Sequence, residues 1–163
     1  MLRRFWLVSI VALLVLPAFA QAQFKQGDWA VTFTADGTAQ KDLDTFDASL
    51  TAGPEYFLTD QISIGLKNTL SLSDGGSNRN GAIRAFGFWN FDLGRWVPYI
   101  GANIGYAYGD SINDDFIAGP EGGVRYFVNS TTYIQANLAY EFNLNEGFDE
   151  GAWFYGLGIG FKF

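Results

Sequence analysis

The last twelve residues of the chain, Ala152-Trp-Phe-Tyr-Gly-Leu-Gly-Ile-Gly-Phe-Lys-Phe163, decide the fold class. From Trp153 to Phe163 a large apolar residue occupies every second position, and glycine fills most of the positions between them. Because successive side chains of a β-strand point to opposite faces, the segment has one bulky apolar face and one face that is nearly bare. It therefore predicts a β-strand whose two faces meet different environments.

The same period of two recurs along the rest of the chain. No segment repeats apolar residues with the spacing of an amphipathic helix, and after residue 22 no apolar run is long enough for a membrane-spanning helix. The alternation predicts eight strands. Their expected ranges are 29–36, 45–58, 62–70, 83–91, 96–108, 116–128, 133–143 and 152–163.

The connections between these strands alternate in length. Three are short turns, at 59–61, 92–95 and 129–132. The other four are longer and rich in Asp, Asn and Gly; they cover 37–44, 73–81, 109–115 and 144–151. Short turns at one end and longer loops at the other are the layout of an antiparallel up-and-down β-barrel in an outer membrane.

The apolar face of the predicted strands is banded. Aliphatic residues lie near the middle of the strands and aromatic residues near their ends, as in a barrel that crosses a lipid bilayer. A secreted soluble barrel of lipocalin type is the alternative, but it would expose few of these aromatics. The belt comprises Val31, Leu50, Leu66, Ile100, Ile104, Leu138 and Leu157; the girdles comprise Trp29, Tyr56, Trp89, Trp96 and Tyr126 at one end and Phe46, Tyr106, Tyr140 and Trp153 at the other.

The first 22 residues have the pattern of a secretory signal peptide. Arg3 and Arg4 precede an apolar run, and small residues with A-x-A spacing follow it. Cleavage after Ala20 or after Ala22 fits the pattern equally. A retained membrane anchor is the alternative, although the run is shorter than the ~20 residues of a spanning helix. We therefore expect residues 23–163 to form an exported barrel domain in the bacterial outer membrane, with both termini periplasmic.

The composition excludes several classes of function. The chain has no Cys and no His, so disulfides, thiol chemistry and the commonest metal ligand and general base are missing. Its formal net charge is −7, which disfavours nucleic acid as a partner. We expect a protein that is not an enzyme and needs no cofactor or metal ion.

The other face of the strands carries six charged residues, which cannot face hydrocarbon cheaply and are therefore expected in the lumen. They are Glu55, Lys67, Arg84, Glu121, Arg125 and Glu141. An eight-stranded barrel has an interior just wide enough for side chains to fill. The six residues are predicted to form an ion-pair plug in which Lys67 lies near Gly53 and Glu55.

Glu121 and Glu141 are expected on adjacent strands at one level of the lumen. A pair of carboxylates at one level is a conceivable acid-base site. Arg84 and Arg125 are expected to flank this level, so a structural ion-pair arrangement is the preferred interpretation.

The longer loops are rich in acidic residues. Carboxylate oxygens suit Ca²⁺ or Mg²⁺, which would bridge these loops to lipopolysaccharide phosphates. Plain solvated loops are the alternative and the favoured interpretation. The acidic residues assigned to the loops are Asp36, Asp42, Asp44, Asp74, Asp110, Asp114, Asp115, Glu146, Asp149 and Glu150.

Pro120 lies in the middle of a predicted strand, where its missing N–H removes a ladder hydrogen bond. A β-bulge at Gly119-Pro120 is the expected accommodation.

Two stretches carry a family resemblance. Residues Trp96-Val-Pro-Tyr-Ile-Gly-Ala-Asn-Ile-Gly-Tyr106 are similar to a strand motif of the small OmpA/OmpX-type outer-membrane barrels. The ending Tyr155 to Phe163, with alternate apolar residues and a terminal Phe, is similar to the signal that the barrel assembly machinery recognises in this family. The resemblance covers residues 24–163. It implies that the barrel assembly machinery recognises the last strand through Leu157, Ile159, Phe161 and Phe163.

The role we expect is structural, in envelope integrity or surface interaction, within outer-membrane lipid and lipopolysaccharide. A narrow solute channel is the second hypothesis and requires an open lumen. An adhesin is the third, because adhesive members of the family have longer surface loops than this chain. The sequence names no ligand.

Overall fold

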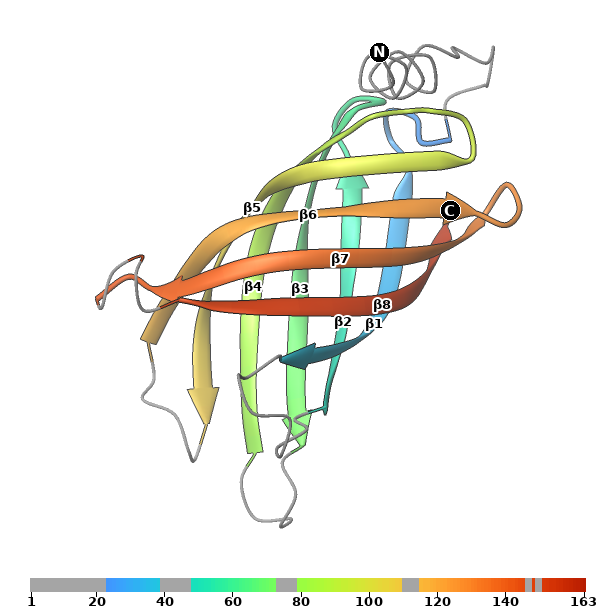
Figure 1. The fold of residues 1–163 in the computed structure, drawn as a ribbon. Helices are drawn as coiled ribbons and strands as arrows, with labels where there is room; N and C mark the ends of the chain where they lie inside the picture. The colour runs from blue at the N-terminus through green and yellow to red at the C-terminus, as the bar shows by residue number, and fades with distance from the viewer. Residues whose placement is uncertain (1–22, 39–47, 73–78, 110–114, 146–147, 149–150) are drawn as a thin grey trace, which may run out of the picture.

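The computed structural model describes residues 23–38, 48–72, 79–109, 115–145, 148 and 151–163. These residues form eight antiparallel strands wrapped into one barrel (Figure 1). The strands are β1 (Trp29–Thr38), β2 (Ala48–Phe57), β3 (Ile62–Leu72), β4 (Arg79–Asn90), β5 (Trp96–Gly109), β6 (Asp115–Phe127), β7 (Thr132–Asn143) and β8 (Ala152–Lys162). The predicted fold, an all-β, eight-stranded antiparallel up-and-down barrel, is confirmed.

Each strand pairs with its neighbours in sequence, and β1 closes the barrel against β8. The closing ladder runs from Ala30↔Lys162 to Thr38↔Phe154. The three short turns, the start of β1 and the end of β8 lie at one end, which we call the turn end; the other end is the loop end (Figure 1). Strands of 10 to 14 residues are long enough to cross a hydrocarbon layer, which takes about 9 to 11 tilted residues.

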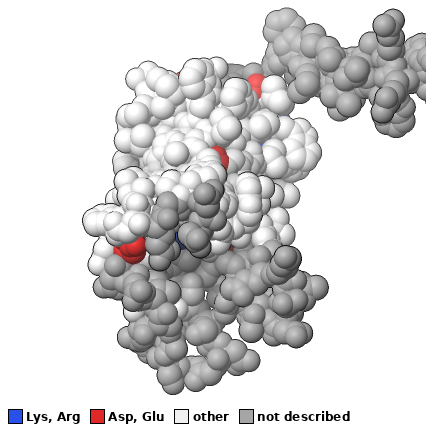
Figure 2. All heavy atoms as spheres, turned by 60° about the vertical axis from the view of Figure 1, so that its left-hand side comes forward, with Lys and Arg blue, Asp and Glu red and all other residues white. Residues whose placement is uncertain are grey.

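The outer wall is apolar. Leu66 and Leu157, both from the predicted aliphatic belt, are 53% and 69% exposed, and all four predicted girdle tryptophans are more than half exposed. Figure 2 shows one face of this wall, on which the described surface has few acidic or basic atoms. A surface this rich in exposed large apolar side chains would be unstable in water, so it indicates contact with lipid. The girdle residue Phe46 lies outside the described residues.

The expected bulge at Gly119-Pro120 is wrong. The register of β6 is the same on both sides of Pro120, against β5 (Ala102↔Pro120) and against β7 (Ala118↔Phe142, then Glu121↔Ala139). Pro120 has an exposed side chain, and the pairs missing from the ladder are on the β7 side. The proline costs ladder hydrogen bonds on one side only, so no extra residue is needed.

Gly119 makes this regular register possible. A Cβ built on Gly119 would lie 1.7 Å from the carbonyl oxygen of Tyr140, so only glycine lets the two backbones approach this closely. The second Gly-Pro pair of the barrel behaves in the same way. A Cβ on Gly53 would lie 2.1 Å from the carbonyl oxygen of Leu66, where β2 meets β3.

The strand boundaries differ from the prediction mainly at β4, which begins at Arg79 and not at residue 83. Its first residues read Arg-Asn-Gly and have low intrinsic strand preference. They are strand because β3 and β5 flank them, with Leu72↔Arg79 and Asn80↔Gly109 in register. Most residues of the four longer loops lie outside the described residues.

No helix among the described residues is long and apolar enough to cross a membrane.

Candidate functional site in the barrel lumen

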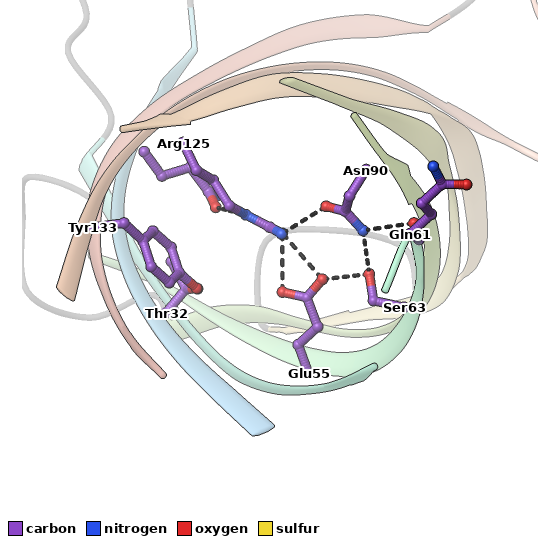
Figure 3. Close-up of polar contacts among 8 residues, drawn as sticks. Thr32, Glu55, Gln61, Ser63, Asn90, Arg125 and Tyr133 are labelled. Atoms are coloured by element: carbon purple, nitrogen blue, oxygen red, sulfur yellow. Dashed lines mark hydrogen bonds and ion pairs between the residues drawn. The ribbon is translucent and has the colours of Figure 1, made fainter. Parts of the chain in front are cut away.

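All six charged residues predicted for the lumen lie there, and they form three ion pairs in two groups. The first group lies in the half of the lumen nearest the turn end and centres on Arg125 (Figure 3). Its guanidinium binds both carboxylate oxygens of Glu55, with Nη2 at 2.9 Å from Oε2 and 3.1 Å from Oε1. Nη1 donates to Asn90 Oδ1 at 2.8 Å and Nε donates to Gln135 Oε1 at 3.0 Å. The side chain of Arg125 is 1% exposed.

The partners of Arg125 are held by further hydrogen bonds. Ser63 Oγ donates to Glu55 Oε1 at 2.5 Å, and Asn90 Nδ2 donates to Ser63 Oγ at 3.0 Å and to the carbonyl oxygen of Gln61 at 3.1 Å (Figure 3). Strands β2, β3, β4, β6 and β7 all contribute to this group. It therefore ties together strands that do not pair through their backbones.

Aromatic rings surround the same guanidinium. The Arg125 Cζ atom lies 4.5 Å from the ring centre of Tyr99, 5.6 Å from that of Tyr133 and 5.3 Å from that of Phe24. Rings at these distances attract a cation through their electron-rich faces. The hydroxyl of Tyr133 also shares a hydrogen bond of 2.7 Å with Thr32 Oγ1. The turn half of the lumen is therefore filled by one cation, its counter-ion and a shell of rings.

The second group lies in the half nearest the loop end and contains the other two pairs. Arg84 Nη2 is 2.7 Å from Glu141 Oε2, and Arg84 Nη1 donates to Thr69 Oγ1 at 2.8 Å. Lys67 pairs with Glu121. Asn103 Nδ2 donates a second hydrogen bond, at 3.1 Å, to Glu121 Oε2, the oxygen that also binds Lys67.

Four buried polar atoms have no hydrogen-bond partner among the described residues. Two belong to the loop half, Arg84 Nε and Asn103 Oδ1. The others are Tyr99 Oη and Asn137 Oδ1. Unpaired buried polar atoms are costly. The group of Arg84 and Lys67 in the loop half is therefore less completely hydrogen-bonded than the group around Arg125 in the turn half.

The predicted partners are partly wrong. Arg84, which is expected beside the level of Glu121 and Glu141, pairs with Glu141. Lys67 lies beside Gly53 as predicted, but it pairs with Glu121 instead of Glu55. Glu55 pairs with Arg125. Register between neighbouring strands places residues along the wall, whereas these long side chains reach across the lumen to strands that are not neighbours.

Asp36 ends the predicted strand 29–36 and is also counted among the acidic loop residues, and the loop assignment is wrong. It lies on β1 opposite Ser49 and Gly156, with a half-buried side chain that accepts a hydrogen bond from Thr51. Thr51 Oγ1 in turn lies 2.7 Å from Thr69 Oγ1. Asp36 therefore belongs to the loop half of the lumen. Of the other acidic loop residues only Asp115 is described, and the described residues hold no cluster of three or more potential metal ligands.

Phe24 is a lumen residue that the sequence analysis missed. It precedes β1, is 2% exposed, and stacks on Phe57 with ring centres 4.0 Å apart. Phe127 and Tyr133 meet the edges of its ring at 5.1 and 5.7 Å. The sequence signal that could have identified it is a single large apolar residue within the otherwise polar segment 23–28. Phe24 closes the lumen at the turn end.

The arrangement does not favour acid-base chemistry. Each of the three predicted lumen glutamates is engaged in an ion pair, and Glu121 and Glu141 are bound to different cations, so the two carboxylates do not form a pair with each other. What the network can do is hold the strands together and obstruct the lumen.

The apolar wall and the charged, filled lumen define a class, the eight-stranded barrels that cross a membrane. The sequence matches no protein-family model and no curated protein. Among solved structures it is similar to the N-terminal β-barrel domain of Pseudomonas aeruginosa OprF, with a TM-score of 0.63 and 20% identity over 85% of this chain and 98% of that chain.

Two further solved structures have the same architecture. The outer membrane protein OprG from Pseudomonas aeruginosa has a TM-score of 0.59 and 16% identity, over 87% of this chain and 98% of that chain. Neisserial surface protein A has a TM-score of 0.58 and 17% identity, over 84% of this chain and 96% of that chain. The chain thus has the fold of the small outer-membrane barrels of OmpA/OmpX type, as its sequence predicts.

Proposed function

We propose that the chain is an integral protein of the bacterial outer membrane, whose closed barrel has a structural role in envelope integrity or surface interaction. The observation that carries this proposal is the lumen. Three ion pairs and buried aromatic rings occupy it from the turn end to the loop half. The protein is not an enzyme in this proposal, and it uses no cofactor.

The outer wall and the similar solved structures support the membrane location, and the lengths of the connections support the orientation. The exposed aliphatic side chains match hydrocarbon, and the similar solved structures include outer-membrane proteins. Outer-membrane barrels have short periplasmic turns and longer extracellular loops. The turn end, with both termini of the described barrel, is accordingly proposed to face the periplasm.

Planar-bilayer recordings test whether the lumen is closed. The wild-type protein is expected to show no sustained single-channel steps. Phe24→Ala combined with Arg84→Ala should leak, because the first change removes the ring that closes the turn end and the second removes the side chain that spans the loop half to Glu141. Phe24→Ala combined with Arg84→Lys is the matched control and should leak less, since it keeps a long cation in the loop half. Sustained, ion-selective steps in the wild type would reject the closed barrel.

A narrow channel is the second candidate, and Asp36 is the observation that favours it. The cations Lys67, Arg84 and Arg125 are each paired with one glutamate, and Asp36 is a further carboxylate among the described lumen residues. An excess of carboxylates would favour cations over anions. The channel hypothesis therefore predicts cation-selective steps that weaken in Asp36→Asn.

The envelope role has a cellular test. Deleting the gene should raise sensitivity to detergent, and restoring the closed wild-type barrel should reverse the effect. Lipopolysaccharide bridged to the loop end by Ca²⁺ or Mg²⁺ is the proposed surface contact, and a chelator should then reduce co-purified lipopolysaccharide. Host-cell binding by the wild type would instead favour the third hypothesis, adhesion.

We also propose that β8 is the strand recognised by the barrel assembly machinery. The outward side chains Leu157, Ile159 and Phe161 of β8 and the following Phe163 are all exposed, and they alternate along the chain as one apolar row. Replacing Phe161 and Phe163 by Ser should slow insertion and lead to periplasmic proteolysis. Replacing the outward pair Ile62 and Ile64 of β3 by Ser is the control for loss of apolar surface alone.

A further inference from the structure

Residues 23–28 form a short segment that lies across the turn end of the lumen and holds Phe24 inside it. The main chain of the segment is tied to four different parts of the barrel. Gln26 N donates to Asp60 Oδ1 at 2.8 Å, Gly27 N donates to the carbonyl oxygen of Phe57 at 2.9 Å, and Lys162 Nζ donates to the carbonyl oxygen of Gln23 at 2.6 Å. The segment is a defined part of the fold, and its first contact with the barrel is made by the nitrogen of Gln23.

That nitrogen lies 3.0 Å from Asp92 Oδ2, in the turn between β4 and β5. The other carboxylate oxygen of Asp92 accepts the N–H of Gly94 at 2.9 Å, which orients the group toward Gln23. Asp92 is half-buried and forms no ion pair with a Lys or Arg of the described residues, whereas Asp28 in the same region faces Lys162 Nζ at 3.4 Å. A carboxylate at this place would gain more from a cation than from an amide, because charge-assisted hydrogen bonds are about twice as strong.

Cleavage of the chain directly before Gln23 would supply such a cation. Both Ala18-Phe19-Ala20 and Ala20-Gln21-Ala22 have the spacing that a signal peptidase accepts, so the pattern alone does not choose between two cuts. Hydrolysis of the Ala22–Gln23 peptide bond consumes one water molecule and leaves a carboxylate on Ala22 and an ammonium group on Gln23. Hydrolysis after Ala20 places the ammonium group on Gln21, two residues before Gln23 in the chain, and leaves the Gln23 nitrogen an uncharged amide.

We propose that the signal peptide is cut between Ala22 and Gln23, and that the freed α-ammonium group of Gln23 forms an ion pair with Asp92 which holds Phe24 in the turn end of the lumen. This inference rests on the proposed export of the chain. Processing then does more than remove an address, because it creates the charge that fastens the closure.

Phe24 connects this closure to the charged lumen. Its ring stacks on Phe57 and lies 5.3 Å from Arg125 Cζ, so the segment 23–28 covers the most buried ion pair of the barrel. Loosening the segment would admit water to that pair. The ion pair at Gln23 is therefore expected to stabilise the folded barrel as well as its own segment.

The first experiment is the intact mass of the protein purified from outer membranes. A chain that begins at Gln23 with an uncyclised amino group is expected. A chain that begins at Gln21 overturns the proposed cut, and a mass lower by one ammonia, which marks a cyclised N-terminal Gln, overturns the ion pair. A chain that retains Met1 contradicts export itself, and so rejects the proposed function separately.

The second experiment is a double-mutant cycle on the refolded protein in detergent micelles. Four proteins begin at Gln23 or at Gln21 and carry Asp92 or Asp92→Asn. Asp92→Asn should lower the equilibrium constant for folding in both backgrounds. The decrease should be roughly tenfold larger for chains that begin at Gln23 than for chains that begin at Gln21. Equal losses in the two backgrounds overturn the ion pair.

Asp60→Asn is the matched control for this cycle. Asp60 accepts a main-chain N–H from Gln26, but no cut can turn that nitrogen into an ammonium group. Its effect should be the same in chains that begin at Gln23 and at Gln21. A dependence on the first residue as large as that of Asp92→Asn would show that the longer N-terminus disturbs the whole segment, and would overturn the specific pairing.

Discussion

The two halves of the lumen hold charges in different ways. In the turn half, Arg125 uses Nε, Nη1 and Nη2, and its counter-ion Glu55 also binds Ser63. In the loop half, Arg84 Nε has no partner among the described residues, and the side chain of Lys67 is 15% exposed. The turn half is also covered by Phe24, whereas the loop half has polar neighbours such as Thr69.

This difference shows where the barrel can accept a change. A buried ion pair is stable only when its remaining donors and acceptors are satisfied, and losing one partner then leaves an uncompensated charge. Such a loss is most costly in the enclosed turn half. In the loop half, water can solvate a charge that has lost its partner. We therefore expect the loss of an ion-pair partner to cost more stability in the turn half than in the loop half.

The largest expected effect is that of Arg125→Ala. It leaves Glu55 in a dry site beside aromatic rings, and we expect a loss of about 3–5 kcal/mol in the free energy of unfolding. Denaturant unfolding in detergent micelles measures it. The control Arg95→Ala removes an exposed side chain from the turn between β4 and β5 and should change stability little. Similar values for the two variants would contradict a stabilising role of the Arg125 group.

Arg84→Ala should cost less, about 1–3 kcal/mol, because water from the loop half can reach Glu141 once the guanidinium is gone. The same unfolding experiment measures it. This variant tests the comparison directly, since both substitutions remove an arginine from an ion pair with a glutamate. A loss equal to that of Arg125→Ala would mean that the two halves are equally enclosed.

Gly160→Ala should give a smaller loss in the turn half. A Cβ on Gly160 would lie 2.1 Å from Cζ of Tyr133, whose side chain is fully buried and hydrogen-bonded. Overpacking offset by the better strand preference of Ala predicts a net loss of about 0.5–2 kcal/mol. In Gly87→Ala the nearest atom is 3.9 Å away, so that variant should be neutral or more stable. A neutral Gly160→Ala would show that the turn half has room to relax.

The smallest expected effect is that of Thr51→Val in the loop half. It removes the hydroxyl between Asp36 and Thr69, and water can replace it, so we expect at most about 0.5–1.5 kcal/mol. Thr32→Val is the counterpart in the turn half, where it removes the partner of the buried Tyr133 hydroxyl. Thermal unfolding should show a larger loss for Thr32→Val. The reverse order would place the better enclosed network in the loop half.

The strands and their two faces were predictable because each depends on a local rule. Alternation along one strand decides which side chains share a face, so Arg84 and Glu141 were correctly expected inside the barrel. The loop assignment of Asp36 was wrong because the predicted strand stopped at residue 36, while the pairing of β1 with β8 extends the strand past it to Thr38. The bulge predicted at Pro120 was wrong because only the pairing of β6 with β7 is interrupted there, while the pairing with β5 continues in the same register.

The sequence by itself determined the number of strands, the apolar wall and the set of charges that must face inward, because a period of two and the cost of a charge in hydrocarbon act residue by residue. The tertiary structure alone decided which charges meet. Glu55 with Arg125 and Lys67 with Glu121 span strands that share no ladder, and Phe24 enters the lumen from outside the strands. These contacts depend on closure, tilt and side-chain reach across the barrel, and no pattern along one strand records them.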